Sequence, residues 1–330
     1  MSRAETKKTV LVAGAANLIL AFTKLAAGVL AGSSAMMAEA AHSVADTLNQ
    51  GFLLASLRRS ARPPDKHHPF GYGNERYFWS LLAAFGIFVA GGGYSIFEGV
   101  LAITGHGGAG TQVWLAYAVL ALAALLEGAS WVRAYTQARR ETRGDGPGVV
   151  EHVRRTPDVT FKAALFEDSA AMVGLAFAAA GLTLRELTGS AVWDGVASIL
   201  IGLLLVVVAV ALGRDSMGLL IGRAADPAAQ RAIRAEIEGA PGVTGVEELL
   251  TMHFGPDDIL VAAKVHFSDD ISADEAEDVA GAIDASLRER LPIVRHVFLD
   301  PTQEGGTDPA PARYRRRLLA RPRPGGRTPA

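Results

Sequence analysis

Residues 192–212 read VWDGVASILIGLLLVVVAVAL, and this stretch decides the class of fold. It is 21 residues long and contains one charged residue, Asp194. The hydrocarbon core of a bilayer needs about 20 mostly apolar residues in one helix, so we expect a membrane-spanning helix here. Five stretches of similar character precede it: 9–30, 35–57, 79–103, 113–135 and 161–184. The sequence therefore predicts an all-α domain of six transmembrane helices.

The composition of the whole chain agrees with a membrane protein. Of the 330 residues, 50% are hydrophobic and 20% are charged, whereas soluble domains carry about 25% charged residues. The chain has no cysteine, which excludes disulfides, thiolate metal sites and cysteine nucleophiles. The run 9–30 is too long for the apolar region of a signal peptide, and a second run follows at once, so we expect it to remain as a span.

Basic residues gather at alternate connections between these stretches. They precede the first stretch and recur between the second and third and between the fourth and fifth, as Arg3, Lys7, Lys8, Arg58, Arg59, Arg62, Lys66, Arg76, Arg133, Arg139, Arg140, Arg143, Arg154 and Arg155. Cytoplasmic loops carry an excess of Lys and Arg. We therefore expect both termini in the cytoplasm and a multi-pass protein of the plasma (inner) membrane.

The composition changes after the sixth stretch. Residues 226–308 contain 18 Asp or Glu and 6 Lys or Arg. Turn residues and apolar alternation predict helix 228–238, strand 243–254, strand 259–267, helix 272–290 and strand 293–299. The expected domains are thus a six-span transport domain, 1–225, and a small cytoplasmic α+β domain, 226–303.

A tail, residues 304–330, completes the expected organisation. It is rich in Pro, Gly and Arg, and such a composition predicts disorder. A basic segment beside a membrane attracts anionic lipid, so we expect the bilayer and no nucleic acid as its partner.

The stretch 35–57 contains three ionisable side chains, Glu39, His42 and Asp46. Each costs about 2.5–3.5 kcal/mol in a span and so needs a reason. His42 and Asp46 stand four residues apart, on one helix face, and offer the nitrogen and oxygen ligands that zinc accepts. The alternative is a hydrogen-bonded pair that joins two helices. We favour a metal because Glu39 lies one turn before.

The fifth stretch contributes Glu167 and Asp168. Neighbouring residues point about 100° apart on a helix, so one of them can face the second span. The alternative is a solvated pair at the mouth of the bundle. A structural role is favoured for the other polar residues in the spans: Asn17, Lys24, Glu98, Glu127 and Asp194. Of these, Lys24 can neutralise a carboxylate. The Ala-Gly-Gly-Gly run at 90–93 indicates close helix packing and no phosphate loop.

Three segments resemble the cation diffusion facilitator family of divalent-metal transporters: AEAAHSVADT at 38–47, HPFGYG at 68–73 and GAPGV at 239–243. The resemblance implies six spans, a C-terminal α-β-β-α-β dimerisation domain, homodimers and proton-coupled export. It also implies a tetrahedral site between spans two and five, in which His42 and Asp46 match the first half.

The second half of that site departs from the best-known branch of the family. Ala164 stands where that branch has its first ligand, while 167–170, Glu-Asp-Ser-Ala, resembles a subgroup with a mitochondrial or nuclear animal relative. Asp168 is the first candidate ligand in this span and Glu167 the second. Because oxygen ligands dominate, manganese, cobalt and iron(II) remain open beside zinc.

Two accessory sites of the family are only partly matched. Asp65 and His68 match the loop site, where Tyr72 replaces a histidine and His67 is an adjacent substitute. In the C-terminal domain the family's metal ligands fall on Glu247, Lys264, Phe298 and Asp300. Because a lysine repels a cation, we expect no binuclear zinc site there, and ordinary roles for the three domain histidines, His253, His266 and His296.

The expected function is export of a divalent cation, zinc first, from the cytoplasm in exchange for protons. The metal ion is then a substrate, and no resident cofactor is expected. Neither the nucleotide motif G-x-x-x-x-G-K-[ST] nor the protease motif H-E-x-x-H occurs, so we expect no enzyme. The alternative is a metal-sensing or partner-binding membrane protein without net transport.

Overall fold

The computed structural model describes residues 3–106, 112–141 and 158–302, together with residues 110, 153 and 156. The chain divides into two compact units. The first comprises Met1–Ala224 and Met252–Ile259, and the second Ala225–Thr251 and Leu260–Ala330. The predicted disordered tail, 304–330, lies outside the described residues.

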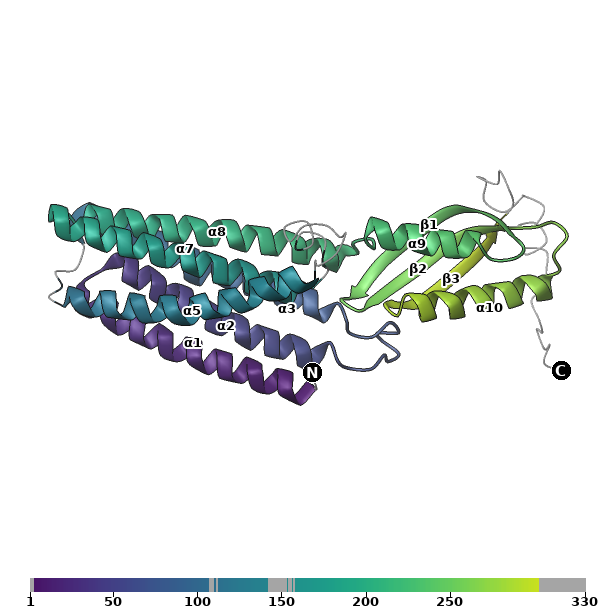
Figure 1. Cartoon of the computed structure of the whole chain (residues 1–330), viewed down its shortest axis with the longest axis horizontal. Helices are drawn as coiled ribbons and strands as arrows, with labels where there is room; N and C mark the ends of the chain where they lie inside the picture. The colour runs from purple at the N-terminus through teal and green to yellow at the C-terminus, as the bar shows by residue number, and fades with distance from the viewer. Residues whose placement is uncertain are drawn as a thin grey trace, which may run out of the picture. The chain divides into compact units, whose positions relative to one another are not determined.

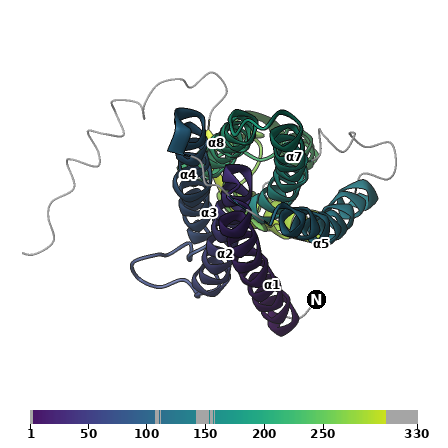
Figure 2. The ribbon, with the colours of Figure 1, turned by 90° about the vertical axis from the view of Figure 1, so that its left-hand side faces the viewer.

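The first unit is a bundle of long helices (Figures 1 and 2). Its elements are α1 (Arg3–Ala31), α2 (Ser34–Arg59), α3 (Glu75–Gly86), the π-helix η1 (Ile87–Gly93), α4 (Tyr94–Leu101), the π-helix η2 (Ala102–His106), α5 (Val113–Glu141), α7 (Val159–Thr188) and α8 (Val192–Ile221). Helix α2 packs against α1, α3, α4, α7 and α8. It is therefore the central helix, and polar groups on it are surrounded by protein.

Among the described residues of this unit, four helices are long and apolar enough to cross a membrane: Glu75–Gly105, Val113–Arg140, Val159–Thr188 and Val192–Ile221. The first runs through α3, η1, α4 and η2. In α1, the residues whose side chains are described contain the shorter apolar part Asn17–Ala31. Helix α2 carries Glu39, His42 and Asp46 along its length. The C-terminal four of the six expected spans are thus found, and a count of six stays a prediction.

Glycines let α8 approach the third span closely. A Cβ on Gly92 would lie 2.8 Å from Val206 Cγ2 and one on Gly99 would lie 2.5 Å from the carbonyl oxygen of Gly195. Small residues allow such backbone contacts between membrane helices. The prediction that the glycine run at 90–93 packs helices is confirmed.

The C-terminal part of the chain has the predicted element order. Its elements are α9 (Pro227–Glu238), β1 (Val243–Gly255), β2 (Asp258–Phe267), α10 (Ala273–Arg290) and β3 (Val294–Thr302), with sheet order β1-β2-β3. Both helix starts are capped as their sequence predicts, α9 by Asp226 and α10 by a capping box between Ser272 and Glu275.

The small core of this second unit follows from two periodicities. In β2 every second residue is buried, as in Val261, Ala263 and Val265, which is the pattern of a strand with one covered face. The helices bury residues four apart: Ile233 and Ile237 from α9, and Ile283 and Leu287 from α10.

Candidate functional site

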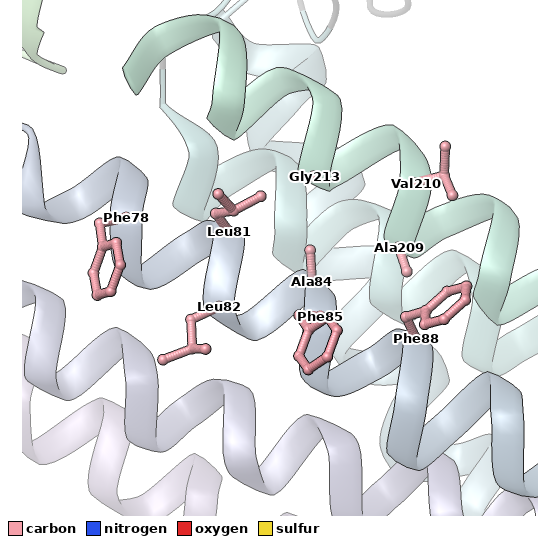
Figure 3. Close-up of a pocket in the computed structure, with 9 residues that line it drawn as sticks. All are labelled: Phe78, Leu81, Leu82, Ala84, Phe85, Phe88, Ala209, Val210 and Gly213. Atoms are coloured by element: carbon pink, nitrogen blue, oxygen red, sulfur yellow. The ribbon is translucent and has the colours of Figure 1, made fainter. Parts of the chain in front are cut away.

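One cavity of the bundle is unsuited to an ion. It has a volume of about 380 Å³ and lies between α3, η1 and α8, lined by Phe78, Leu81, Leu82, Ala84, Phe85, Phe88, Ala209, Val210 and Gly213 (Figure 3). No lining side chain has a nitrogen or oxygen atom, so this cavity has nothing with which to replace the water around a cation.

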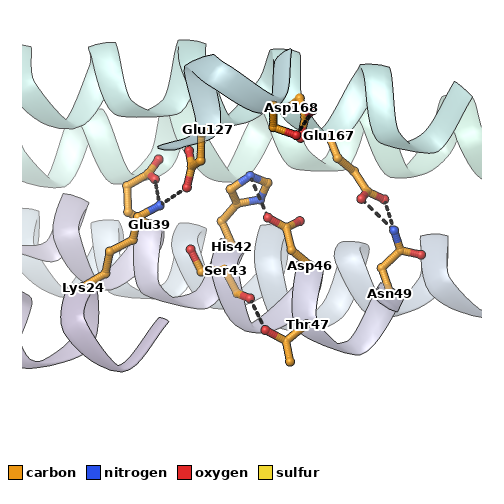
Figure 4. A network of polar contacts seen from close by, with 11 residues as sticks. Lys24, Glu39, His42, Ser43, Asp46, Thr47, Asn49, Glu127, Glu167 and Asp168 are labelled. Atoms are coloured by element: carbon orange, nitrogen blue, oxygen red, sulfur yellow. Dashed lines mark hydrogen bonds and ion pairs between the residues drawn. The ribbon is translucent and has the colours of Figure 1, made fainter. Parts of the chain in front are cut away.

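Helix α2 instead presents a polar stripe. Glu39, His42, Asp46 and Asn49 follow one another at intervals of three, four and three residues, which keeps them on one face. Figure 4 shows the stripe pointing toward α7. Glu39 is 0% and His42 is 1% exposed, and the helix start is fixed by Ser33, whose side chain accepts the N–H of Met36. Of the predicted span-two candidates, Glu39 and His42 thus lie deep in the bundle, and the side chain of Asp46 is 15% exposed.

His42 and Asp46 lie close together but do not form a hydrogen bond with each other. Nε2 of His42 lies 3.6 Å from Oδ2 of Asp46, too far for a hydrogen bond. Both ring nitrogens of His42 and Oδ1 of Asp46 are buried without a hydrogen-bond partner. Each such atom costs about 1–3 kcal/mol. The pair therefore keeps lone pairs for a cation, as the metal interpretation requires.

The two candidates on α7 have different partners. Both carboxylate oxygens of Glu167 accept from Nδ2 of Asn49, at 2.7 and 2.6 Å. Asp168 accepts one bond, from Oγ of Ser130 on α5, at 2.8 Å. The residues point apart, as their adjacency predicts, and Asp168 keeps more of its oxygen lone pairs.

A small cavity reaches Glu167. Its volume is about 60 Å³, and its lining includes Asn49, Gln50, Arg76, Thr160 and Glu167. A water molecule needs about 10–15 Å³ of such space, so a few water molecules fit. Glu167 and Asn49 therefore stand where a partly hydrated ion can meet the polar stripe.

Lys24 of α1 lies between two carboxylates. Its Nζ donates to Oε2 of Glu39 and to Oε1 of Glu127 on α5, both at 2.8 Å. The prediction that Lys24 neutralises a carboxylate is confirmed, but sequence reasoning did not foresee two. The sequence does contain an indication of the second partner. Lys24 is the single charged residue of 9–30, and Glu127 is a lone carboxylate among apolar neighbours.

A second polar network joins the ends of α7 and α8 to the start of α2. Asp194 accepts from Ser33 Oγ at 2.8 Å and from the Ser34 N–H at 2.6 Å, and Arg185 lies 3.4 Å from its Oδ2. Each oxygen of Asp194 thus has a partner, which supports the structural role expected for it.

The loop candidates Asp65 and His68 are held by local contacts. Oδ1 of Asp65 accepts the N–H groups of His67 and His68, and Oδ2 accepts the hydroxyl of Tyr72 at 2.6 Å. The Tyr72 hydrogen bond, followed by the His68 N–H, lowers the pKa of Asp65. His68 packs on the Tyr72 ring, with centroids 4.2 Å apart. These contacts close the turn, and metal binding there stays a prediction.

In the C-terminal domain, one of the four positions that match the family's metal ligands holds a lysine, Lys264, in an ion pair. Lys264 pairs with Glu248 at 3.0 Å, and this contact raises the pKa of Lys264. His266 contacts Glu247 at 3.9 Å and the Thr302 carbonyl at 3.2 Å. Burial lowers the pKa of His253, while Phe298 is half exposed. The absence of a binuclear zinc site stays a prediction.

The structure brings the main candidates near one another without assembling them. Figure 4 shows His42, Asp46, Glu127, Glu167 and Asp168 around one stretch of α2 and α7. Over the described parts of the chain, no three His, Asp or Glu side chains converge as a metal site. An ion would have to draw these ligands together.

A bundle that buries a histidine, several carboxylates and a lysine in apolar helices is typical of an ion-handling membrane protein. The chain belongs to the cation efflux family, the cation diffusion facilitators. Residues 10–221 match the cation efflux transmembrane domain, and residues 225–301 match the cytoplasmic domain of cation efflux proteins. The family resemblance is thereby confirmed, and the fifth-span subgroup stays a prediction.

Several curated relatives are similar over most of the chain. The proton-coupled zinc antiporter SLC30A9, mitochondrial, of Xenopus laevis is 35% identical over 260 residues, which are 79% of this chain and 46% of the relative. Its Homo sapiens counterpart is 32% identical with the same coverage. Metal tolerance protein C4 of Arabidopsis thaliana is 35% identical over 236 residues, 72% of this chain and 51% of the relative. The chain spans about half the length of these relatives.

The expected location in the plasma (inner) membrane, with cytoplasmic termini, is wrong by this comparison. The SLC30A9 relatives are named as mitochondrial, which does not agree with a plasma membrane. The physical reason is plain: the Lys and Arg pattern distinguishes the two faces of a membrane but carries no information about which membrane it is.

Proposed function

We propose that this chain carries a divalent metal ion, zinc in the first place, across a membrane in exchange for protons. The observation that carries the proposal is the set of buried, unpartnered lone pairs on His42 and Asp46, beside Asp168 of α7. The family match supports a cation as the cargo, and relatives named as proton-coupled zinc antiporters support zinc and protons.

The charges around the stripe support a dication. Figure 4 shows five carboxylates along the stripe, those of Glu39, Asp46, Glu127, Glu167 and Asp168, and one ammonium group, that of Lys24, which pairs with Glu39 and Glu127. Uncompensated charge inside apolar helices is costly. A divalent ion among these groups offsets part of the excess, and protons offset it when the ion has left. Because metal ligands must be deprotonated to bind, uptake of the ion releases protons.

The route begins at the small cavity beside Glu167 and Asn49. A hydrated ion exchanges water for Glu167 oxygens there and then reaches Asp46, Asp168 and His42. In this proposal α1 and α2 also cross the membrane, which makes six spans, and transport runs in the efflux direction. The α-β-β-α-β unit joins two chains into a homodimer, for which the match of residues 225–301 to the family's C-terminal domain is the support.

Reconstitution tests the proposal. The full chain in liposomes is expected to move zinc when a pH gradient is imposed, and Asp46→Ala is expected to lose this flux by about 100-fold or more, since even outer partners of metal ligands change activity by about 10–100-fold. Asp215→Asn is the matched control, because Asp215 is a carboxylate of the same unit that pairs with Lys162 and Arg223.

Three results would contradict the proposal in different ways. Equal flux in wild type and Asp46→Ala would refute the site. Zinc flux that is unaffected by the pH gradient would refute proton coupling. Zinc binding without any flux would favour the metal-sensing alternative.

A further inference from the structure

The ammonium group of Lys24 is held as a bound cation would be. Two carboxylates from different helices, Glu39 and Glu127, each place one oxygen 2.8 Å from Nζ. Lys24 and Glu39 are 0% exposed, and the side chain of Glu127 is 11% exposed. Two buried carboxylates that converge on one positive charge resemble a metal site with oxygen ligands.

This cluster has oxygen atoms to spare. Oε1 of Glu39 and Oε2 of Glu127 are buried and have no hydrogen-bond partner, and the same holds for both nitrogens of His42 on the next turn of α2. An ion pair that serves only structure is stable when its remaining lone pairs are satisfied. Here two carboxylate oxygens and an imidazole are left unsatisfied along one stretch of the bundle, which indicates a second ligand for the cluster.

The cluster continues the polar stripe of α2. Glu39 precedes His42 by three residues, about 4.5 Å along the helix axis, on the side of the α1–α2 turn. Figure 4 shows Lys24, Glu39 and Glu127 at one end of the stripe, followed by His42 and then Asp46. An ion that leaves His42 and Asp46 toward this turn therefore meets Glu39 and Glu127 next.

Helix α7 makes room for the free oxygen of Glu39. A Cβ built on Gly174 would lie 2.5 Å from Oε1 of Glu39, so only a glycine leaves this oxygen its place. Asp168 stands on the same helix, six residues earlier. The free oxygen is thus directed at the helix that also carries a candidate ligand of the first position.

We propose that Glu39 and Glu127 form a second position for the transported divalent cation, which Lys24 occupies in this conformation. The ion takes the place of the ammonium group during its passage, and Lys24 returns when the ion has left. The flexible four-carbon stem of lysine permits this movement. The inference rests on the proposed function and adds a fourth-span residue, Glu127, to its route.

The first test counts bound zinc. The full chain in detergent is equilibrated with zinc, separated by gel filtration and analysed for metal per chain. Lys24→Gln is expected to bind one zinc ion more than wild type, and the double variant Lys24→Gln/Glu127→Gln is expected to lose this gain. Lys24→Arg keeps the position filled by a positive charge and is expected to bind as wild type does.

Lys162→Gln is the matched control for the loss of a buried lysine. Lys162 is 1% exposed and pairs with Asp215 at 2.6 Å, so its removal disturbs the fold in a similar way. It is expected to leave the zinc content at the wild-type value. A folded Lys24→Gln variant with the wild-type zinc content would overturn the proposal.

A second variant decides the matter if Lys24→Gln fails to fold. Glu127→Gln keeps the Lys24–Glu39 pair and the shape of the side chain but removes the charge of the second position. Its maximum zinc flux is expected to fall about tenfold with unchanged zinc affinity, because His42 and Asp46 are intact. Normal flux in Glu127→Gln overturns the second position while Asp46-dependent flux of wild type still supports the proposed function.

Discussion

Lys24 and Lys162 are both buried in the helical unit, and they are surrounded differently. Lys24 is one cation between two carboxylates, Glu39 and Glu127. Lys162 of α7 shares one carboxylate, Asp215 of α8, with a second cation, Arg223. The distances are alike, 2.8 Å in the first cluster and 2.6 and 2.9 Å in the second.

The two clusters differ in whether their carboxylate oxygens all have partners, and this difference separates the proposed cation site from an ion pair that only joins helices. In the Lys162 cluster, Oδ2 of Asp215 accepts from Lys162 and Oδ1 from Arg223, so the carboxylate is saturated. In the Lys24 cluster each glutamate keeps one oxygen without a partner. Burial of charge is common to both. It is the unsatisfied oxygen, and not burial, that marks a place for a cation.

The largest expected effect separates Asp168 from Glu167. Asp168→Ala is expected to lower zinc flux by about 100-fold or more and Glu167→Ala by about tenfold. The reason is that Ser130 engages one oxygen of Asp168, whereas Asn49 engages both oxygens of Glu167. Initial rates in liposomes, corrected for the amount of folded protein, give the comparison.

Asp215→Ala is the control for this pair, since it removes a saturated carboxylate from the Lys162 cluster. It is expected to lower the thermal stability and to keep the flux per folded molecule. A larger loss in Glu167→Ala than in Asp168→Ala would reverse the order of the two candidates and make Glu167 the ligand from α7.

A smaller effect is expected from steric displacement without any change of charge. Gly174→Ala brings a methyl group to within 2.5 Å of Oε1 of Glu39 and must push the carboxylate aside. A shift of about 1 Å at a functional group can cost up to about 10²-fold, and we expect about tenfold lower zinc flux. Zinc flux in liposomes again measures it.

Gly213→Ala, near the Lys162 cluster, is the control for Gly174→Ala. A Cβ there would meet Leu81 and Ala84 at 3.7 and 3.8 Å, which is ordinary contact. Alanine stabilises a helix relative to glycine by about 0.5–1 kcal/mol, so neither variant should unfold. Equal flux in the two variants would show that the position of Glu39 does not matter.

Sequence reasoning recovered what depends on local pattern. Apolar length gave the four C-terminal spans, turn residues and alternation gave α9, β1, β2, α10 and β3, and four-residue spacing placed His42 and Asp46 on one face. The adjacency of Glu167 and Asp168 correctly predicted that they point apart, because helix geometry alone decides it.

The partners across helices could not be predicted in this way. Nothing in the spacing tells how far α5 is rotated toward α1, and that rotation brings Glu127 to Lys24, 103 residues away in the chain. The capture of both Glu167 oxygens by Asn49 depends likewise on the packing of α2 against α7. Local patterns identify the ionisable residues of a membrane bundle, while the tertiary packing decides which of them are satisfied.

The smallest expected effect concerns Asp65, an exposed carboxylate whose two oxygens both have hydrogen-bond partners, as those of Asp215 do. Asp65 has a partner for each oxygen, and the hydrogen bond from Tyr72 is the main cause of its lowered pKa. The ionised carboxylate stabilises the turn fully above the pKa of an unfolded aspartate, about 3.9. This stabilisation is lost as the pH falls through the lowered pKa of the folded turn.

Tyr72→Phe removes that donor and leaves the N–H groups of His67 and His68 in place. The pKa of Asp65 is expected to move up toward its ordinary value, so the turn loses the contribution at a higher pH than in wild type. Carbon-13 NMR of the aspartate carboxyl groups across a pH series measures this. Tyr117→Phe, which removes a hydroxyl that contacts Thr183 and Glu186, should leave the Asp65 titration unchanged. If Tyr72→Phe also leaves it unchanged, the two backbone donors at Oδ1 alone keep the pKa of Asp65 low, and Oδ2 becomes available to the metal ion that the loop motif predicts.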